Sequence, residues 1–227
     1  MPSPTTEQRE KYEAVYDLLV ETYGEPQQRE RQRQPPVDQL VNTILSQQTT
    51  SANRERAFSR LKERFPDWEA VMEAPLEEVV EAIRPAGLAN QKAPRIQNAL
   101  RHVMRERGEL TLDFLAERPV DEAKAWLTEI KGVGPKTAAI ILLFTFNRPA
   151  FPVDTHVHRV SQRLGLIGEN VSAAKAHDVL EELVDPEAYY PFHINLIRHG
   201  REICQARTPK CAVCPLQEHC DYYQRTR

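Results

Sequence analysis

The stretch LTEIKGVGPKTAAIILLFTFNRPAFPVDTHVHR, residues 127–159, decides how this chain folds. Apolar residues keep helical spacing on both sides of the Gly-Val-Gly run at 132–134. Two glycines around a single residue let the backbone reverse with positive φ, and Pro135 suits the first position of the next helix, where its missing N–H costs nothing. The pattern predicts two helices joined by a tight turn, and a further helix that begins at Asp154.

The start of the helix after this turn is a candidate phosphate-binding site. The first N–H groups of a helix have no intrahelical acceptor and lie at the positive end of the helix dipole. We expect the backbone at Gly132, Gly134, Lys136 and Thr137 to contact phosphate through this arrangement. A helix pair with a glycine corner and no partner would carry the same glycines, so the turn alone leaves both interpretations open.

Lys136 and Asp154 favour a chemical role for the turn. The helix dipole opposes a cation in the first turn, so a lysine there favours the neutral amine that a nucleophile requires. A helix over 135–146 is about 18 Å long at 1.5 Å per residue, and the connector over 147–153 spans up to about 23 Å. Asp154 can therefore return to the end that carries Lys136, although an Asp before Thr-His-Val is also a good N-cap.

The pattern hxxhxGxGxxxA (h is apolar), followed by VDTH from Val153, resembles the HhH-GPD DNA glycosylases and specifically the endonuclease III-like enzymes. The resemblance implies that Lys136 and Asp154 are the catalytic pair of a DNA glycosylase that also cleaves abasic sites. It implies double-stranded DNA with damaged bases or abasic sites as the partner. Pro135 stands where that family usually has Arg, which removes one charge near the pocket.

Composition and charge set the broad class. The 227 residues are 41% hydrophobic and 28% charged, as in ordinary globular proteins. The longest apolar run, 138–144, is too short to span a membrane, and the N-terminus has no signal-peptide core. We expect a cytoplasmic monomer without membrane contact. The net charge of −3 argues mildly against nucleic acid, but six basic residues and one acid in 84–107 allow a basic face.

Helical spacing recurs along the whole chain, and no segment alternates with the period of a strand. Helices are predicted from the first residues to Tyr23, from Pro36, Asp67, Pro75 and Asn90, in a pair within 112–129, and over 154–166, 172–184 and 189–204. The fold class is therefore all-α. The polar run from Gln27 to Pro36 is predicted to be a linker. By the resemblance, residues 28–148 form a central lobe, residues 1–27 and 149–227 form a cluster lobe, and DNA binds in a cleft between the lobes.

Two polar segments resemble the loops with which endonuclease III fills the duplex when a base is extruded. LSQQTTS, residues 45–51, resembles LSAQATD and implies that Gln48 enters the gap left by the base; Ser51 replaces the family's Asp. GLANQKA, residues 87–93, resembles GLYNSKA and implies that Leu88 enters from the opposite strand. Lys92 and Arg95 would then contact phosphates. Without the resemblance, the first segment is a helix-to-helix turn and Leu88 a core contact.

All four cysteines fall within seventeen residues, with the spacing C-x6-C-x2-C-x5-C: Cys204, Cys211, Cys214 and Cys220. Disulfides are rare in an intracellular chain. Four thiolates suit structural zinc, although zinc sites usually pair two CxxC units and this chain has one. They also suit an iron–sulfur cluster, which tolerates uneven loops. The spacing matches the loop of endonuclease III, which implies a [4Fe–4S] cluster.

The remaining expectations concern DNA contacts and the reaction. Arg201, near the cysteines, is expected to hold a phosphate, and His156, two residues after Asp154, is expected to face DNA rather than a metal. The resemblance implies removal of oxidised pyrimidines through a lysine imine and β-elimination. Two alternatives remain. One is a monofunctional mismatch or modified-base glycosylase (uracil, thymine or methylcytosine) in which Asp154 activates water, and the other is a non-catalytic helix-hairpin-helix module that binds DNA.

Overall fold

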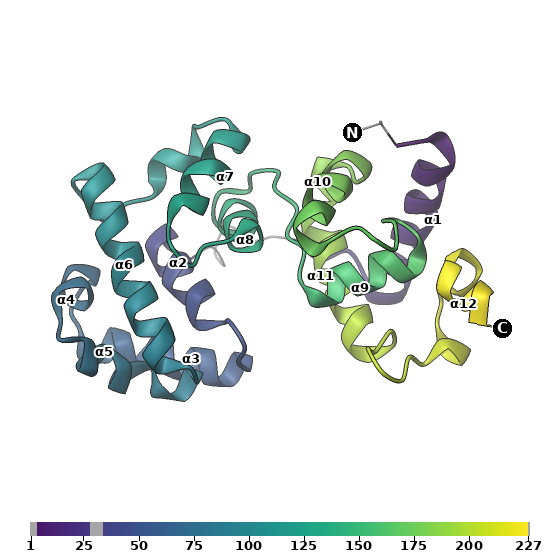
Figure 1. Ribbon diagram of the computed structural model, residues 1–227. Coiled ribbons are helices and arrows are strands. Elements are labelled where there is room, and N and C mark those ends of the chain that lie inside the picture. Colours follow the sequence, from purple (N-terminus) through teal and green to yellow (C-terminus); the bar gives the residue numbers. More distant parts are fainter. Residues whose placement is uncertain (1–3, 28–33, 227) are drawn as a thin grey trace. The chain divides into compact units, whose positions relative to one another are not determined.

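The protein consists of two compact helical units (Figure 1). The computed structural model describes residues 4–27 and 34–226, and within them it contains helices and no strand. Unit 1 comprises the described residues of Met1–Gln32 and Pro149–Arg227, and unit 2 comprises those of Arg33–Arg148. The predicted all-α class is confirmed, and residues 28–33 of the predicted linker lie outside the described residues.

Unit 2 is a continuous run of chain, and its helices surround the long helix α6 (Figure 1). In chain order its elements are α2 (Pro36–Leu45), α3 (Ser51–Arg64), α4 (Trp68–Glu73), α5 (Leu76–Ile83), the 3₁₀ turn η2 (Arg84–Ala86), α6 (Ala89–Arg107), the 3₁₀ turn η3 (Asp113–Ala116), α7 (Val120–Glu129) and α8 (Pro135–Phe146). Helix α2 packs against α8 and α6, and α7 packs against α8. This packing fixes the turn between α7 and α8 on the unit's core.

The helix boundaries of unit 2 follow local capping rules. Thr50 and Asp67 accept hydrogen bonds from the backbone at the starts of α3 and α4, as expected for N-cap residues. The predicted start at Asn90 is one residue late, because α6 begins at Ala89 directly after Leu88. Lys92 therefore lies in the first turn of α6.

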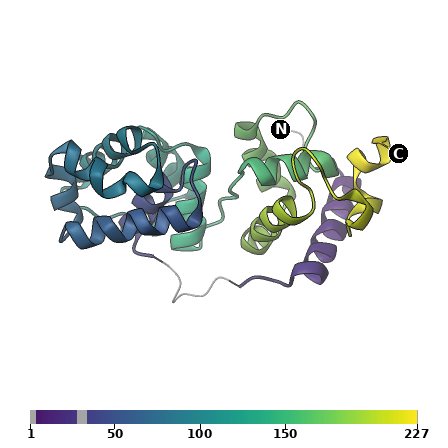
Figure 2. The same ribbon diagram turned by 90° about the horizontal axis from the view of Figure 1, so that it is seen from below.

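Unit 1 joins the first helix of the chain to the last four α-helices. Its elements are α1 (Thr6–Tyr23), α9 (Thr155–Leu164), α10 (Ala173–Leu183), η4 (Pro186–Ala188), α11 (Tyr189–Glu202), η5 (Cys211–Val213), η6 (Gln217–His219) and α12 (Asp221–Thr226). Helix α1 contacts α10, α11 and η6. Figure 2 shows the purple N-terminal helix beside the yellow C-terminal segment of this unit. The short helix α12 was not predicted.

An aromatic core holds unit 1 together. Tyr12 of α1 meets Phe192 of α11 edge-on, with ring centroids 5.4 Å apart. Phe151 lies 6.0 Å from Phe192 and is fully buried. Edge-to-face pairs of this kind contribute about 0.5–1.5 kcal/mol beyond their buried area. The core thus ties α1 to chain segments that follow unit 2.

No helix among the described residues is long and apolar enough to cross a membrane.

Candidate functional site

The turn between α7 and α8 is tight, but its two glycines have different conformations. Gly132 has a φ of 96°, as predicted, and Val133, 4% exposed, anchors the turn and donates its N–H to the carbonyl of Ile130. Gly134 has a φ of −100° and caps the N-terminus of α8 in an extended conformation. The prediction of positive φ is therefore wrong for Gly134, because the reversal is complete before that residue.

The first turn of α8 presents free donors. The N–H of Ala138 makes the bond to the carbonyl of Gly134 that opens the helix, so the N–H groups of Lys136 and Thr137 precede the intrahelical ladder. Pro135 has no N–H and fills the first helical position. The Thr137 side chain is 6% exposed. Thr137 can therefore offer a ligand its backbone N–H but not its hydroxyl.

The Lys136 side chain is exposed in this first turn. Within the described parts of the chain, its ammonium has no ion pair and no hydrogen bond. A cation near a helix N-terminus, without a carboxylate to offset the dipole, destabilises the helix by about 0.3–1 kcal/mol. The local structure thus leaves this amine available to a ligand at a position where stability alone disfavours it.

Asp154 caps α9 with one of its two carboxylate oxygens. Oδ1 accepts hydrogen bonds from the N–H groups of His156 and Val157, both at 2.8 Å. Oδ2 has no hydrogen-bond partner among residues 4–27 and 34–226. The half-buried carboxylate therefore keeps one oxygen for another function. Asp154 belongs to unit 1 and Lys136 to unit 2, so their pairing stays a prediction.

His156 and Arg201 lie on neighbouring helices of unit 1. Nδ1 of His156 is 3.1 Å from Nη2 of Arg159, and a Cβ atom on Gly200 would lie 3.0 Å from the Cβ of His156. Gly200 thus allows α11 to approach α9 closely at His156. The Arg201 side chain, next along α11, is exposed. Both predicted DNA contacts stay predictions, and their positions permit them.

Gln48 and Leu88, the two predicted wedge residues, share an unusual backbone conformation. Each is exposed and has a φ of 50°, in the left-handed region that is uncommon for residues other than glycine, asparagine and aspartate. Gln48 follows the end of α2, and Leu88, 43% exposed, follows η2 and Gly87. Leu88 is therefore not the core contact that would be its ordinary role.

The structure corrects the prediction that Lys92 contacts a phosphate. Its side chain is 1% exposed, and its Nζ donates to the carbonyls of Leu45 at 2.8 Å and Ala86 at 2.9 Å. A buried ammonium cannot reach a phosphate, so the predicted DNA contact of Lys92 is wrong. Burial lowers the pKa of Lys92, and the charge of Arg95 lowers it further.

Arg95 and Gln47 link the segment that carries Gln48 to the glycine turn, a connection that the sequence did not reveal. Nη1 of Arg95 donates to Oε1 of Gln47 at 2.9 Å, and Nε2 of Gln47 donates to the carbonyl of Gly132 at 3.4 Å. The aliphatic part of Arg95 also covers Gly132, since a Cβ there would be 3.2 Å from its Cδ. Arg95 therefore supports the turn through Gln47, and its predicted phosphate contact stays a prediction.

The four cysteines line one cavity beside α9 and α11, with an empty volume of about 380 Å³ that includes open solvent. Cys220 is buried and the other three are half-buried. Two side chains of neighbouring helices reach the thiols. Nη1 of Arg163 lies 3.3 Å from Sγ of Cys204, and Nε2 of His199 lies 3.6 Å from Sγ of Cys214. Burial raises the pKa of Cys214 to about 11, so the thiol must lose a proton to become a ligand.

The four thiols supply the ligand set of either predicted metal site. Structural zinc takes four thiolates about 2.3 Å from one ion. An iron–sulfur cluster also takes four thiolates and tolerates uneven loops between them.

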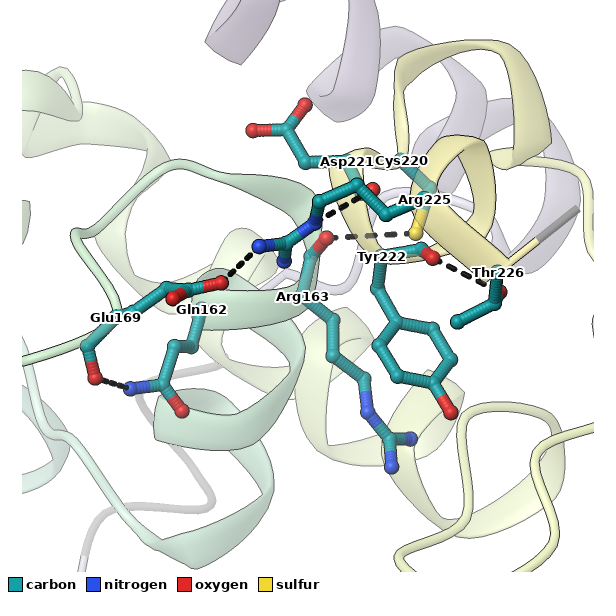
Figure 3. Close-up of polar contacts among 8 residues, drawn as sticks. All are labelled: Gln162, Arg163, Glu169, Cys220, Asp221, Tyr222, Arg225 and Thr226. Carbon is teal, nitrogen blue, oxygen red and sulfur yellow. Dashed lines mark hydrogen bonds and ion pairs between the residues drawn. The ribbon is translucent and has the colours of Figure 1, made fainter.

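The chain beyond the cysteines is fastened to α9 (Figure 3). The thiol of Cys220 donates to the carbonyl of Arg163 at 3.4 Å, and the Arg163 guanidinium lies 4.7 Å from the ring centre of Tyr222. Arg225 forms an ion pair with Glu169. These contacts place the last cysteine against α9 and explain why Arg163 matters to a site that the sequence defined by its cysteines alone.

Comparison with known families gives two matches that together cover most of the chain. Residues 41–186 match the HhH-GPD superfamily of base excision DNA repair proteins. Residues 204–220 match the iron–sulfur binding domain of endonuclease III, and this range begins at the first cysteine and ends at the last.

Curated relatives and solved structures agree with these matches. The chain is 34% identical to endonuclease III of Thermotoga maritima over 84% of each sequence. It is 35% identical to endonuclease III of Bacillus subtilis, over 82% of this chain and 80% of the relative. A solved structure described as a trapped endonuclease III–DNA covalent intermediate superposes with a TM-score of 0.81 at 30% identity, covering 96% of this chain and 99% of the other.

Proposed function

The chain belongs to the HhH-GPD superfamily of base excision DNA repair proteins, and on that premise we propose that it is a bifunctional DNA glycosylase that cuts the strand at the site it has opened. The substrate is double-stranded DNA that contains an oxidised pyrimidine or an abasic site. Lys136 is the nucleophile and Asp154 the electrostatic partner. The enzyme acts as a monomer.

The reaction begins with the neutral amine of Lys136. Its Nζ attacks C1′ of the damaged nucleotide, the N-glycosidic bond breaks, and the base leaves with the electron pair and takes up a proton. Asp154 stabilises the positive charge that develops on the sugar as the base departs. Nζ then loses one proton, the C1′–O4′ bond breaks as O4′ takes up a proton, and a protonated imine remains between Nζ and C1′. Loss of a proton from C2′ expels the 3′ phosphate, and water releases the enzyme.

The other residues of the site bind and open the duplex. The N–H groups at the start of α8 hold a phosphate without reading sequence, which suits an enzyme that acts at many sites. Extrusion of a base costs a few kcal/mol, and Gln48 and Leu88 offset part of that cost by filling the gap. Arg201 and His156 contribute further contacts from unit 1.

The iron–sulfur cluster belongs to unit 1, with Cys204, Cys211, Cys214 and Cys220 as its proposed ligands. A cluster held by these four thiolates would cross-link the loop of residues 204–220 and stiffen it. The structure supports this role, because Arg163 and His199 already approach two of the thiols.

One observation carries the proposal: the amine of Lys136 is exposed at a helix N-terminus with no partner among the described residues. The test is borohydride trapping, which reduces an imine to a stable amine. We expect a covalent protein–DNA adduct both with duplex that contains an oxidised pyrimidine and with duplex that contains an abasic site.

The two substrates separate the steps. The abasic duplex requires no base release, so an adduct there reports imine formation alone. Base release that leaves alkali-labile sites, with no adduct on either duplex, would mean that water is the nucleophile and Asp154 activates it. Binding to both duplexes without chemistry would favour the non-catalytic module.

The two glycines of the turn give a further prediction. Gly132→Ala should lower the free energy of unfolding by about 1–2 kcal/mol, because a side chain at positive φ is strained, and Arg95 leaves its Cβ little room. Gly134→Ala should leave stability within about 0.5 kcal/mol, since its backbone is extended and, apart from its chain neighbours, no atom of the described residues lies within 4 Å of a Cβ there.

For DNA binding, we expect Gly134→Ala to have a larger effect than Gly132→Ala. A methyl group at Gly134 occupies the space beside the free N–H groups, so Gly134→Ala should weaken binding of abasic-site duplex by about tenfold, the effect of 1.4 kcal/mol. Thermal unfolding and fluorescence anisotropy measure the two effects. Wild-type affinity in Gly134→Ala would show that no phosphate approaches this residue.

A further inference from the structure

Two exposed side chains of unit 2 stand on backbone that ordinary residues avoid. Among the described residues, positive φ outside glycine occurs at Gln48, Leu88 and Asn147. Asparagine tolerates this conformation, whereas glutamine and leucine adopt it when their surroundings impose it. Something in the structure must therefore hold the two segments in place.

Lys92 contacts the backbone just before each of the two exposed residues. Leu45, whose carbonyl accepts one bond from its Nζ, is the last residue of α2 and lies three residues before Gln48. Ala86, whose carbonyl accepts the other, is the last residue of η2 and lies two residues before Leu88. Carbonyls at helix ends have no intrahelical donor. One ammonium thus satisfies the ends of two helices at the points from which the two exposed residues depart.

Among the described residues, Lys92 has no ion pair that would explain why a charged side chain is buried here. It is among the largest of the fully buried side chains, and its Nζ donates to these two carbonyls. A buried charge is costly, and an apolar side chain of similar shape would fill the same space without that cost. What the ammonium adds is a shared anchor for two separate loops.

We propose that Lys92 is a positioning residue that holds the Gln48 and Leu88 loops in one arrangement before DNA binds. The inference rests on the proposed function, in which these two side chains fill the duplex around the extruded nucleotide. Loops that are already fixed lose no conformational entropy when the base leaves the stack. Lys92 therefore lowers the free-energy cost of base extrusion. Lys92 itself touches neither DNA nor the reacting atoms.

The same helix offers a matched control. Gln97 on α6 is 3% exposed, and its Nε2 donates to the carbonyls of Val71 at 3.0 Å and Ala74 at 2.8 Å, at the end of α4. Lys92→Met and Gln97→Met each remove two hydrogen bonds from a buried α6 side chain to carbonyls at a helix end. Both should lower the melting temperature, but only Lys92→Met loosens the segments that carry Gln48 and Leu88.

The experiment compares single-turnover base release from two duplexes. One holds an oxidised pyrimidine in a full base pair, and the other holds it in a single-base bulge, where extrusion costs less. For Lys92→Met we expect the ratio of the paired rate to the bulged rate to fall by about tenfold, which corresponds to 1.4 kcal/mol at 25 °C. Gln97→Met should keep the wild-type ratio. An unchanged ratio in Lys92→Met, or the same fall in Gln97→Met, would overturn the proposal.

Two additions keep the test decisive. If Lys92→Met does not fold, Lys92→Gln replaces it, because the amide keeps donors but is too short to reach both carbonyls, and its ratio must fall as well. If the wild type releases no base, the proposed function fails and a binding readout takes over. Fluorescence of 2-aminopurine opposite an abasic-site analogue should then rise on binding of the wild type and Gln97→Met, and rise less with the Lys92 variant; equal rises would sink the positioning role.

Discussion

Lys136→Gln should abolish both base release and strand cleavage while leaving the protein folded. The amide nitrogen has no free electron pair with which to attack C1′, so the loss should be about 10⁴–10⁶-fold, as for removal of other catalytic nucleophiles. The side chain is exposed and unpaired within the described residues, and removing its charge from a helix N-terminus should stabilise α8 slightly. Borohydride trapping and the melting temperature measure the two effects.

Lys131→Gln is the matched control for this prediction. Lys131 is exposed in the same turn, five residues earlier, and the substitution removes the same charge. We expect it to keep the covalent adduct and to weaken DNA binding modestly. If Lys136→Gln released base at a rate near that of the wild type, the nucleophile would be water, and the lysine would be at most a DNA contact.

Asp154→Asn should lower base release by about 10²–10³-fold, the loss typical of one preorganised electrostatic group. Its stability should stay near that of the wild type, because an amide oxygen can accept the same two hydrogen bonds that Oδ1 accepts from His156 and Val157 and Asn is as good an N-cap as Asp. Asp154→Ala should lose both the activity and about 1 kcal/mol of stability.

Two measurements separate the chemical role of Asp154 from its structural role. Adduct formation on abasic-site duplex should suffer less in Asp154→Asn than base release does, since no base departs there. Ser172→Ala is the control for cap loss, because Ser172 accepts a hydrogen bond from the N–H of Lys175 at the start of α10. It should cost a similar stability and leave activity intact. Full activity in Asp154→Asn would reduce Asp154 to a cap.

The sequence predicted those features that depend on neighbours in the chain. Pro135 and Asp154 mark helix starts through local rules, and the all-α class follows from spacing alone. The cysteine spacing likewise indicated a four-thiol site, and the match of residues 204–220 to the iron–sulfur binding domain of endonuclease III favours a cluster over one ion. Arg163 could not be found in this way, because its approach to Cys204 depends on how α9 lies against a loop 41 residues away.

Lys92 shows where prediction from sequence neighbours fails. A lysine after a polar loop segment predicts a surface contact, yet its acceptors lie 47 and 6 residues away. Only the packing of α2, η2 and α6 brings them together. A signal was present, since Lys92, Ile96, Ala99 and Val103 have the spacing of one helix face and are all buried. A charged residue on an apolar face requires buried partners.

The discontinuity of unit 1 has a consequence for synthesis. Unit 2 can fold as soon as its own residues leave the ribosome, but α1 emerges earlier and its partner α11 much later. About 170 residues separate Tyr23 from Tyr189, which is roughly 8–30 s of translation at 5–20 residues per second. During that interval the apolar face of α1, with Val15 and Leu19, has no partner in unit 1. Nascent chains of this protein should therefore need chaperone protection at their first helix. Cluster assembly must wait until Cys220, the last cysteine, has left the ribosome.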